Sequence, residues 1–314
     1  MPLAGRPNGR MRQRALIRTR AEAIRQLVSL PRPVCDSYLI HTMNTVEIIR
    51  KGVSAERVKL ALFDFDGTLS LVRAGWVDVM VPMMVEILAK LRTGELESEL
   101  RALVNEFVAR LTGEQTVYQM IELAGQVTQR GGHALPPLEY KRIYHERLMC
   151  KIEHRREKLR RKQVSPDRYL VPGARAMLED LRARGLELYC ASGTDESYTR
   201  EEARLLDIDR YFDGRIYGAQ DDYKSFSKQM LVGRMLAPIA GNGDTLIGFG
   251  DGFVEIQNVK DAGGIAVGVA TDEPECLAVD EWKRARLVKV GADFVIPNYL
   301  CWDELSRVLF SARG

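Results

Sequence analysis

Two aspartates at the end of an apolar segment are the residues whose types and spacing could do chemistry. Residues 58–70 read VKLALFDFDGTLS, so Asp64 and Asp66 follow an apolar run and precede a Gly-Thr pair. Side chains two positions apart on an extended chain point the same way, so both carboxylates can face one crevice. Two close anions raise one another's pKa, and a divalent cation would hold one ionised while the other carries a proton. The pattern predicts that one of the two aspartates is a nucleophile and the other a general acid.

Two simpler structures could also contain this segment. One is a plain Asp-Gly turn after a strand, and it stays open on the sequence alone. The other is an EF-hand calcium loop, which needs a glutamate at its twelfth position. Counted from Asp64 that position is Gly75, so the EF-hand is excluded. Gly67 permits a sharp turn here, and the Thr68 hydroxyl can support the loop by hydrogen bonding.

Six short apolar runs predict the strands of one sheet that would position these carboxylates. They read VKLALFDF, LELYCAS, GRIYGA, DTLIGFG, GIAVGVA and DFVIP. Continuous runs of this length suit strands that are buried on both faces of a parallel sheet. Helical patterns lie between most of them, such as GARAMLEDLRARG, in which Gly185 is a predicted C-terminal cap. This alternation predicts right-handed βαβ units and an α/β doubly wound parallel sheet.

One long stretch interrupts the alternation. From about residue 71 to residue 167 we predict no strand, only helical patterns such as WVDVMVPMMVEILAKL and KIEHRREKLRRKQ. A connection of this length between the first and second strands is not a normal crossover, so it predicts an inserted helical domain. We therefore expect a basic N-terminal extension at 1–50, a catalytic core at 51–71 and 168–314, and a helical domain at 72–167.

Positive charge is concentrated at the start of the chain. The formal net charge is +3, yet residues 1–34 contain eight arginines and a single acid, Glu22, so the remainder is mildly acidic. Such a head is typical of an organelle-targeting peptide or a nucleic-acid-binding arm. A solvated helix, or translation that starts at Met43, explains it more simply, and we favour that interpretation. The acidic remainder also disfavours nucleic acid as a partner.

Cysteine spacing and hydropathy indicate the compartment and argue against disulfide, zinc and membrane-spanning structures. The five cysteines are far apart and include no CxxC pair, which predicts neither a disulfide framework nor a zinc site. A reducing, cytoplasmic compartment fits this usage best. No apolar run approaches the roughly 18 residues of a membrane span, so we expect no membrane partner. His133, His145 and His154 lack metal-ligand spacing.

The DFDGT segment resembles the first motif of the haloacid dehalogenase superfamily, whose members are mostly magnesium-dependent phosphatases. Two further segments resemble its second and third motifs in the same order. In LELYCASGT, the Ser192 hydroxyl and the amides around Gly193 would bind phosphate at the start of a helix. In SFSKQMLVGRML, Lys228 would lie at the start of a helix capped by Ser227, and Lys224 is the rival lysine.

The segment LIGFGDGFVEIQNVKDAGGIAVGVA resembles the fourth motif of the superfamily. The resemblance implies a magnesium ion bound by Asp64, Asp251 and the backbone carbonyl of Asp66, with Glu255 as a further acidic contact. Many relatives have aspartate at that last position, so the longer Glu255 leaves open whether its contact is direct or through water. A dinucleotide-binding glycine motif would instead need glycine at 253, where this chain has Phe253.

The branch of the superfamily is indicated by YLVPGARAMLEDLRARGLELYCASGT, which is similar to sequences of phosphoglycolate phosphatase and beta-phosphoglucomutase. In that branch a helical cap lies between the first and second motifs. The resemblance covers about residues 57–300. It implies a magnesium-dependent phosphatase that hydrolyses a small phosphorylated metabolite, of phosphosugar or phosphoglycolate type, through an aspartyl-phosphate intermediate. The alternatives are a phosphomutase of the beta-phosphoglucomutase type and, less favoured, a nucleic-acid-binding or partner-binding protein using the arginine-rich head.

The resemblance also implies a role for each motif residue. Asp64 would attack phosphorus and Asp66 would protonate the leaving alcohol. The phosphate would be bound by Ser192, Gly193, Lys228 and Thr68. The cap is expected to select the substrate, and its polar segment RLTGEQTVYQMIEL could bring Arg110, Glu114 and Gln115 to the crevice. An ordinary exposed loop explains that segment equally well, and the basic run HRREKLRRKQ is interpreted as a solvated helix face.

Overall fold

The computed structural model describes residues 45–220, 222–239 and 243–310 of this chain. The basic head at residues 1–34 and the candidate start residue Met43 lie outside them, so their interpretation stays a prediction.

A seven-stranded sheet runs through the described chain in the order β1-β7-β6-β5-β2-β3-β4. All six predicted apolar runs form strands, β2 to β7, and neighbours among these six are parallel. The predicted α/β doubly wound sheet is therefore confirmed. The strands are β1 (Glu47–Ile48), β2 (Leu60–Phe63), β3 (Glu187–Asp195), β4 (Ile216–Ala219), β5 (Leu246–Gly250), β6 (Ile265–Val269) and β7 (Phe294–Ile296).

The edge strand β1 was not predicted. Its two residues pair antiparallel with β7, Glu47 opposite Val295 and Ile48 opposite Phe294. A strand this short contains no apolar run that would predict it, and its place depends on β7, far along the chain. The sheet thus begins inside the segment that the sequence assigned to the extension at 1–50.

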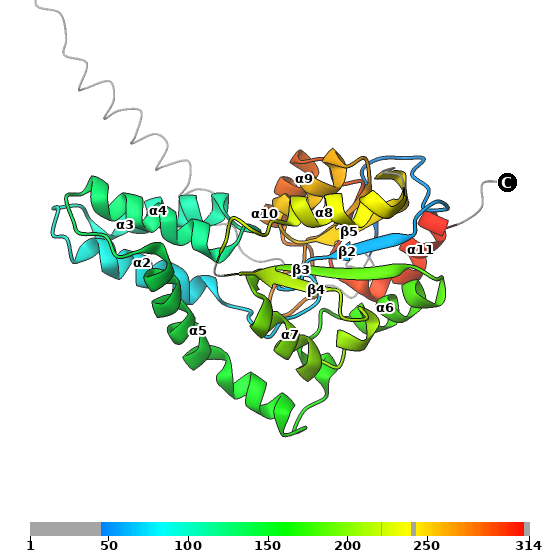
Figure 1. Cartoon of the computed structure of the whole chain (residues 1–314), viewed down its shortest axis with the longest axis horizontal. Helices are drawn as coiled ribbons and strands as arrows, with labels where there is room; N and C mark the ends of the chain where they lie inside the picture. The colour runs from blue at the N-terminus through cyan, green and yellow to red at the C-terminus, as the bar shows by residue number, and fades with distance from the viewer. Residues whose placement is uncertain (1–44, 221, 240–242, 311–314) are drawn as a thin grey trace, which may run out of the picture. The chain divides into compact units, whose positions relative to one another are not determined.

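Side chains of β2 alternate between two hydrophobic clusters, which explains why helices cover both faces of the sheet. Leu60 and Leu62 belong to one cluster with α8, α9 and α10. Ala61 and Phe63 belong to the other, with α6, α7 and α11. Figure 1 shows α8, α9 and α10 on one face of the sheet and α6 and α7 on the other. These helices are α6 (Ala174–Ala183), α7 (Glu196–Leu205), α8 (Lys228–Leu236), α9 (Phe253–Asp261), α10 (Glu281–Lys289) and α11 (Trp302–Phe310).

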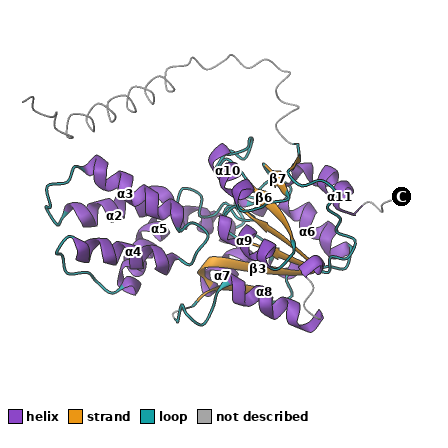
Figure 2. Ribbon diagram, turned by 90° about the horizontal axis from the view of Figure 1, so that it is seen from above, coloured by secondary structure: helices purple, strands orange, loops and turns teal. Residues whose placement is uncertain are grey.

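Four α-helices lie between β2 and α6, in a part of the chain that is described throughout. They are α2 (Val77–Ala89), α3 (Glu97–Arg110), α4 (Thr116–Gln129) and α5 (Pro137–Arg160). Buried residues from them, such as Met83, Leu123 and Leu148, join the cluster that contains Phe63. Figure 2 shows these helices gathered beyond one end of the sheet. We call them the helical insertion; the domain limits at 72 and 167 stay a prediction.

Several local predictions about helix ends are confirmed. Gly185 follows α6 with φ of 83°, the left-handed conformation that a C-terminal glycine cap adopts. Ser227 caps α8, because its Oγ accepts a hydrogen bond from the Met230 amide. Short 3-10 helices complete the described chain at Pro166–Tyr169, Asp209–Tyr211, Ala237–Ile239, Gly243–Thr245 and Tyr299–Cys301.

Two further properties of the described residues concern membrane-spanning helices and the state of the cysteines. No helix among them combines the length and the apolar character needed to cross a membrane. The four described cysteines, Cys150, Cys190, Cys276 and Cys301, are free thiols, and the last three are buried. Cys35 lies outside the described residues.

Candidate active site

The candidate site lies where the strand order of the sheet reverses. From β2 the chain continues to β3 and β4 on one side and later to β5 on the other. In open parallel sheets such a point leaves a crevice beyond the carboxyl ends of the strands, where ligands bind. Asp64 directly follows β2, Ser192 lies in the carboxyl half of β3, and Asp251 directly follows β5. The topology therefore brings three of the predicted motifs to one edge of the sheet.

Lys228 lies beside Asp64. Its Nζ is 2.7 Å from Asp64 Oδ1, and both side chains are buried. The rival Lys224 is exposed, and its Nζ lies over the Tyr223 ring instead. Burial raises the pKa of Asp64, Lys228 lowers it, and the neighbouring Asp251 raises it. The lysine therefore offsets part of the cost of keeping a buried carboxylate ionised.

Asp66 is held by two hydroxyl groups of β3. Its Oδ2 accepts hydrogen bonds from Thr194 Oγ1 at 2.9 Å and from Ser192 Oγ at 3.2 Å. Its Oδ1 is buried and has no hydrogen-bond partner among the described residues. Burial raises the pKa of Asp66, and this effect is partly offset by Arg73, whose Nε is 3.9 Å from Oδ1. A carboxyl group with a raised pKa and one free oxygen suits a group that both gives and takes a proton.

A buried ion pair lies next to Asp66, and the sequence did not predict it. Arg73 donates from Nη2 and Nε to the two carboxylate oxygens of Glu202, at 2.8 and 3.0 Å. Both side chains are almost completely buried. Arg156 Nε lies 3.9 Å from the same glutamate. Because Arg156 is buried too, the interpretation of HRREKLRRKQ as a solvated helix face is wrong at this residue.

The segment after Ser192 is closely approached by the helical insertion. A Cβ atom at Gly193 would lie 2.5 Å from the carbonyl oxygen of Glu114, in the loop between α3 and α4. Only glycine leaves room for this approach. The Ser192 Oγ accepts from the Thr194 amide at 3.0 Å, and Asp195 precedes α7 as predicted. The β3 end thus presents a hydroxyl and a helix start to the crevice, the arrangement predicted for binding phosphate.

Asp251 is fixed by Thr68 and by a second lysine, Lys283, that the sequence did not reveal. The Asp251 amide donates to Thr68 Oγ1 at 3.0 Å. Lys283 Nζ is 2.9 Å from Asp251 Oδ2 and 2.7 Å from Glu273 Oε1. Gly67, with φ of 75°, makes room for this group, because a Cβ there would lie 2.3 Å from Asp251 Oδ2. Thr68, predicted to bind phosphate, is therefore placed where it orients Asp251.

The predicted metal ligands fit a magnesium ion that keeps several waters. Asp251 is close enough to Asp64 to raise the pKa of that carboxyl group. An ion bound by these two carboxylates and the Asp66 carbonyl would have only oxygen ligands. Mg²⁺ is usually bound by one or two carboxylates, waters and substrate phosphate. The described residues contain no group of three or more His, Cys, Asp or Glu side chains that could hold a metal ion. Glu255 is buried against the ammonium group of Lys228.

A cavity of about 100 Å³ lies over these groups, between the strand ends and the helical insertion. Asp64, Asp66, Ser192, Lys228 and Asp251 all line it. From the insertion it is lined by residues of α2, α4 and α5 and of the loop between α3 and α4. The four core motifs therefore open onto one concave space.

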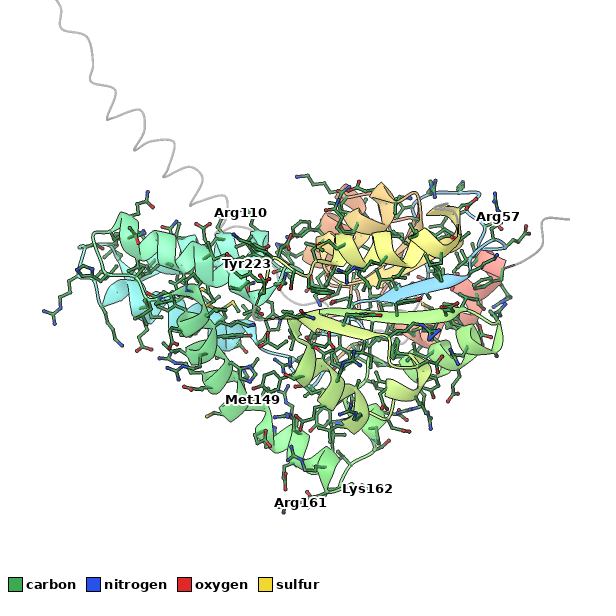
Figure 3. The ribbon with its side chains drawn as sticks, in the orientation of Figure 1. Arg57, Arg110, Met149, Arg161, Lys162 and Tyr223 are labelled. Carbon is green, nitrogen blue, oxygen red and sulfur yellow. The ribbon has the colours of Figure 1, made fainter. Side chains whose placement is uncertain are left out.

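The three predicted specificity residues have different positions. Glu114 lines the cavity. Gln115 is buried, and its Nε2 donates to the carbonyl oxygens of Tyr223 and Phe226 at 2.9 and 2.7 Å, which joins the insertion to the loop before α8. Arg110 is half exposed, forms ion pairs with acidic residues of α3 and α4, and is not among the described residues that line the cavity. Figure 3 labels Arg110 and Tyr223 at the end of the insertion that meets the core.

Comparisons with known proteins agree with this geometry. A family model described as haloacid dehalogenase-like hydrolase matches residues 58–263. Solved structures of similar fold include a predicted phosphoglycolate phosphatase from Haemophilus somnus 129pt, with 13% identity, a TM-score of 0.50, and 80% of this chain and 98% of that chain covered. Another is a predicted phosphatase from Clostridium acetobutylicum, with 18% identity, a TM-score of 0.51, and 80% and 97% covered. At these identities the likeness shows the fold alone. No curated protein matches the sequence.

Proposed function

Because this chain belongs to the haloacid dehalogenase-like hydrolase family, we propose that it is a magnesium-dependent phosphatase of small phosphomonoesters. The observation that carries the proposal is the convergence of the core motifs on one cavity. Lys228 lies 2.7 Å from Asp64, and Ser192 and Thr194 hold Asp66 beside it. These groups can neutralise a phosphoryl group, attack it and protonate its leaving oxygen.

The proposed reaction has two steps. In the first, Asp64 Oδ attacks phosphorus in line, the bond to the alcohol oxygen breaks, and Asp66 gives that oxygen its proton. In the second, Asp66 takes a proton from a water molecule that attacks the aspartyl phosphate, which releases phosphate and restores Asp64. We assign both proton transfers to Asp66 Oδ1, because Oδ2 already accepts hydrogen bonds from Ser192 and Thr194.

Charge neutralisation supplies most of the rate in phosphoryl transfer. Lys228 and the Ser192 hydroxyl would bind the phosphoryl oxygens. A magnesium ion held by Asp64, Asp251 and the Asp66 carbonyl would supply further positive charge there. Thr68 and Lys283 would keep Asp251 in place, and Glu255 would orient Lys228, which it contacts.

A screen of phosphomonoesters for phosphate release, with magnesium and with a chelator, tests the proposal. We expect turnover only with the metal. Asp64→Asn should reduce kcat by at least ~10⁴-fold, because it removes the attacking oxyanion. Its circular dichroism and melting temperature should match those of the wild type. Wild-type turnover in this variant would remove the nucleophile assignment. Accumulation of a substrate isomer with negligible phosphate release would identify a phosphomutase instead.

A further inference from the structure

Two buried polar side chains of the helical insertion face the cavity without a partner. Gln119 of α4 is 4% exposed and Tyr144 of α5 is 5% exposed. Both line the cavity, and no hydrogen bond joins the Gln119 amide or the Tyr144 hydroxyl to another side chain or backbone group of the described chain. Buried amides and hydroxyls are normally hydrogen-bonded, because leaving them unpaired costs free energy. Neither group has a partner within the described chain and both line the cavity, so both are available to a ligand there.

Tyr144 lies close to the group that would protonate the leaving alcohol. Burial raises the pKa of Tyr144, and the nearby charges of Arg73 and Asp66 affect it further. Gln119 lies on α4, which packs against α5. Trp76 and Met80 line the same cavity and give it an apolar wall. This part of the cavity therefore surrounds the alcohol side of a bound phosphomonoester, with two neutral hydrogen-bonding groups and a hydrophobic surface.

The cations of this region are already neutralised. Lys141 of α5 forms an ion pair with Asp195, and Arg73 is held by both oxygens of Glu202. The described side chains that line the cavity include five carboxylates against three lysines and arginines. An additional anionic group on the substrate would have to displace a buried ion pair and would be repelled by the remaining carboxylates.

We infer that Gln119 and Tyr144 bind the leaving group of the substrate, and that this group is a small neutral polyol or sugar rather than a carboxylate or second phosphate. The inference rests on the proposed function and specifies its substrate class. Hydroxyl groups would pair with the amide and the phenol, while the C–H edges would contact Trp76 and Met80.

A matched pair of substrates tests the class. Glycerol 3-phosphate and 3-phosphoglycerate differ at the far end, where one has a neutral CH₂OH and the other a carboxylate. We expect kcat/KM of the wild type with magnesium to be at least tenfold higher for glycerol 3-phosphate. Equal or higher kcat/KM for 3-phosphoglycerate would overturn the inference and would point to Lys141 as an anion-binding residue.

Variants test the two residues. Gln119→Met keeps the length of the side chain, and Tyr144→Phe keeps the ring. Each should raise KM for glycerol 3-phosphate by ~3–10-fold, the range for one neutral hydrogen bond, and change kcat less. Hydrolysis of p-nitrophenyl phosphate, whose leaving group has no hydroxyl, should change less than about twofold. Gln129→Met, an exposed position at the end of the same helix, is the matched control and should change neither. An unchanged KM in both Gln119→Met and Tyr144→Phe would overturn the assignment.

Binding separates this inference from the proposed function. In an Asp64→Asn background, calorimetry should give a lower Kd for glycerol 3-phosphate than for 3-phosphoglycerate, and Tyr144→Phe should weaken the former. A wild-type enzyme that hydrolyses no phosphomonoester, p-nitrophenyl phosphate included, would contradict the proposed function. A reversed order of the two Kd values would overturn the inference while leaving hydrolysis intact. If Gln119→Met does not fold, the KM and Kd of Tyr144→Phe for glycerol 3-phosphate test the inference by themselves.

Discussion

The strand ends and the helical insertion line the same cavity, but they differ in whether their polar side chains have partners within the chain. At the strand ends, Asp64, Asp66 and Asp251 are each in contact with a lysine or a hydroxyl group of the chain itself. On the insertion, Gln119 and Tyr144 have no such contact with the described residues. Every phosphomonoester has the same phosphoryl group, so its partners can be preorganised in the fold. The alcohol differs between substrates, and the groups that select it must keep their hydrogen-bonding capacity for the ligand.

The largest effect is expected at the strand ends. Asp66→Asn should lower kcat for an alkyl phosphate by ~10²–10⁴-fold, because the amide can neither donate an acidic proton nor accept one from water. Steady-state kinetics with magnesium would measure it. Thr194→Val is the companion variant and should cost no more than about tenfold, since it removes only one hydrogen bond to Asp66. A wild-type kcat in Asp66→Asn would contradict the assignment of Asp66 as general acid and base. It would also weaken the contrast between the strand ends and the helical insertion.

Among the ion pairs compared here, the one between Arg73 and Glu202 is expected to contribute most to the free energy of unfolding. Glu202→Gln leaves Arg73 buried without its full counter-charge, so we expect the free energy of unfolding to fall by ~3–5 kcal/mol. The neighbouring Glu201 is 42% exposed and pairs with the buried Arg156 and the exposed Arg160. Because Arg156 also pairs with Glu153 and lies near Glu202, Glu201→Gln should cost less than ~1 kcal/mol. Denaturant unfolding of both variants gives the comparison. Equal losses would mean that the Arg73–Glu202 pair is not a special support of the site.

A smaller, pH-dependent effect is expected on the insertion side. Burial lowers the pKa of His145 to about 4, with a contribution from Arg73. The pKa is lowered on folding, so the neutral ring contributes stability that is present above the unfolded value near 6.5 and is lost as pH falls towards 4. His145→Gln should therefore lose less stability between pH 7 and pH 4.5 than the wild type. We expect a difference of about 1 kcal/mol, because the ring is only half buried. The exposed His133→Gln should follow the wild-type curve.

The smallest effect is expected at Arg110, which the sequence placed among the specificity residues. Its ion pairs with Glu106 and Glu122 are exposed and should contribute less than ~1 kcal/mol. Arg110→Ala should change KM for the preferred substrate less than about twofold, in contrast to Gln119→Met. A large increase in KM would show that the insertion moves enough to bring Arg110 into the cavity during turnover.

The sequence could predict the parts of the fold and the site that depend on local pattern. The apolar runs gave the six parallel strands, and Gly185 and Ser227 marked helix ends correctly. The positions of Asp64, Ser192, Lys228 and Asp251 followed from short motifs at strand and helix ends. Their convergence in space is what the structure adds, while their chemical roles stay proposals.

What the sequence could not predict depends on contacts between distant segments. Arg73 and Glu202 are 129 positions apart, and neither stands in a motif. Lys283 lies in an ordinary charged helix, and only the fold brings it to Asp251. Gln119 and Tyr144 look like unremarkable members of amphipathic helices, because a missing partner can be recognised only once all neighbours are known. The polar loop before α4 does line the cavity, for example with Glu114, but Arg110 at the end of α3 is not among the described residues that line it.

Gly193 is a single position at which a substitution would change the distance between β3 and the loop before α4. One methyl group at this position would act as a spacer under the Glu114 carbonyl and push the loop before α4 outward. Under the proposed function, the space for the alcohol would widen, while the Gly193 backbone that is predicted to bind phosphate would remain. Bulkier alcohols would then gain room at the expense of water exclusion, so this residue would set the balance between breadth of substrate range and protection of the proposed aspartyl phosphate.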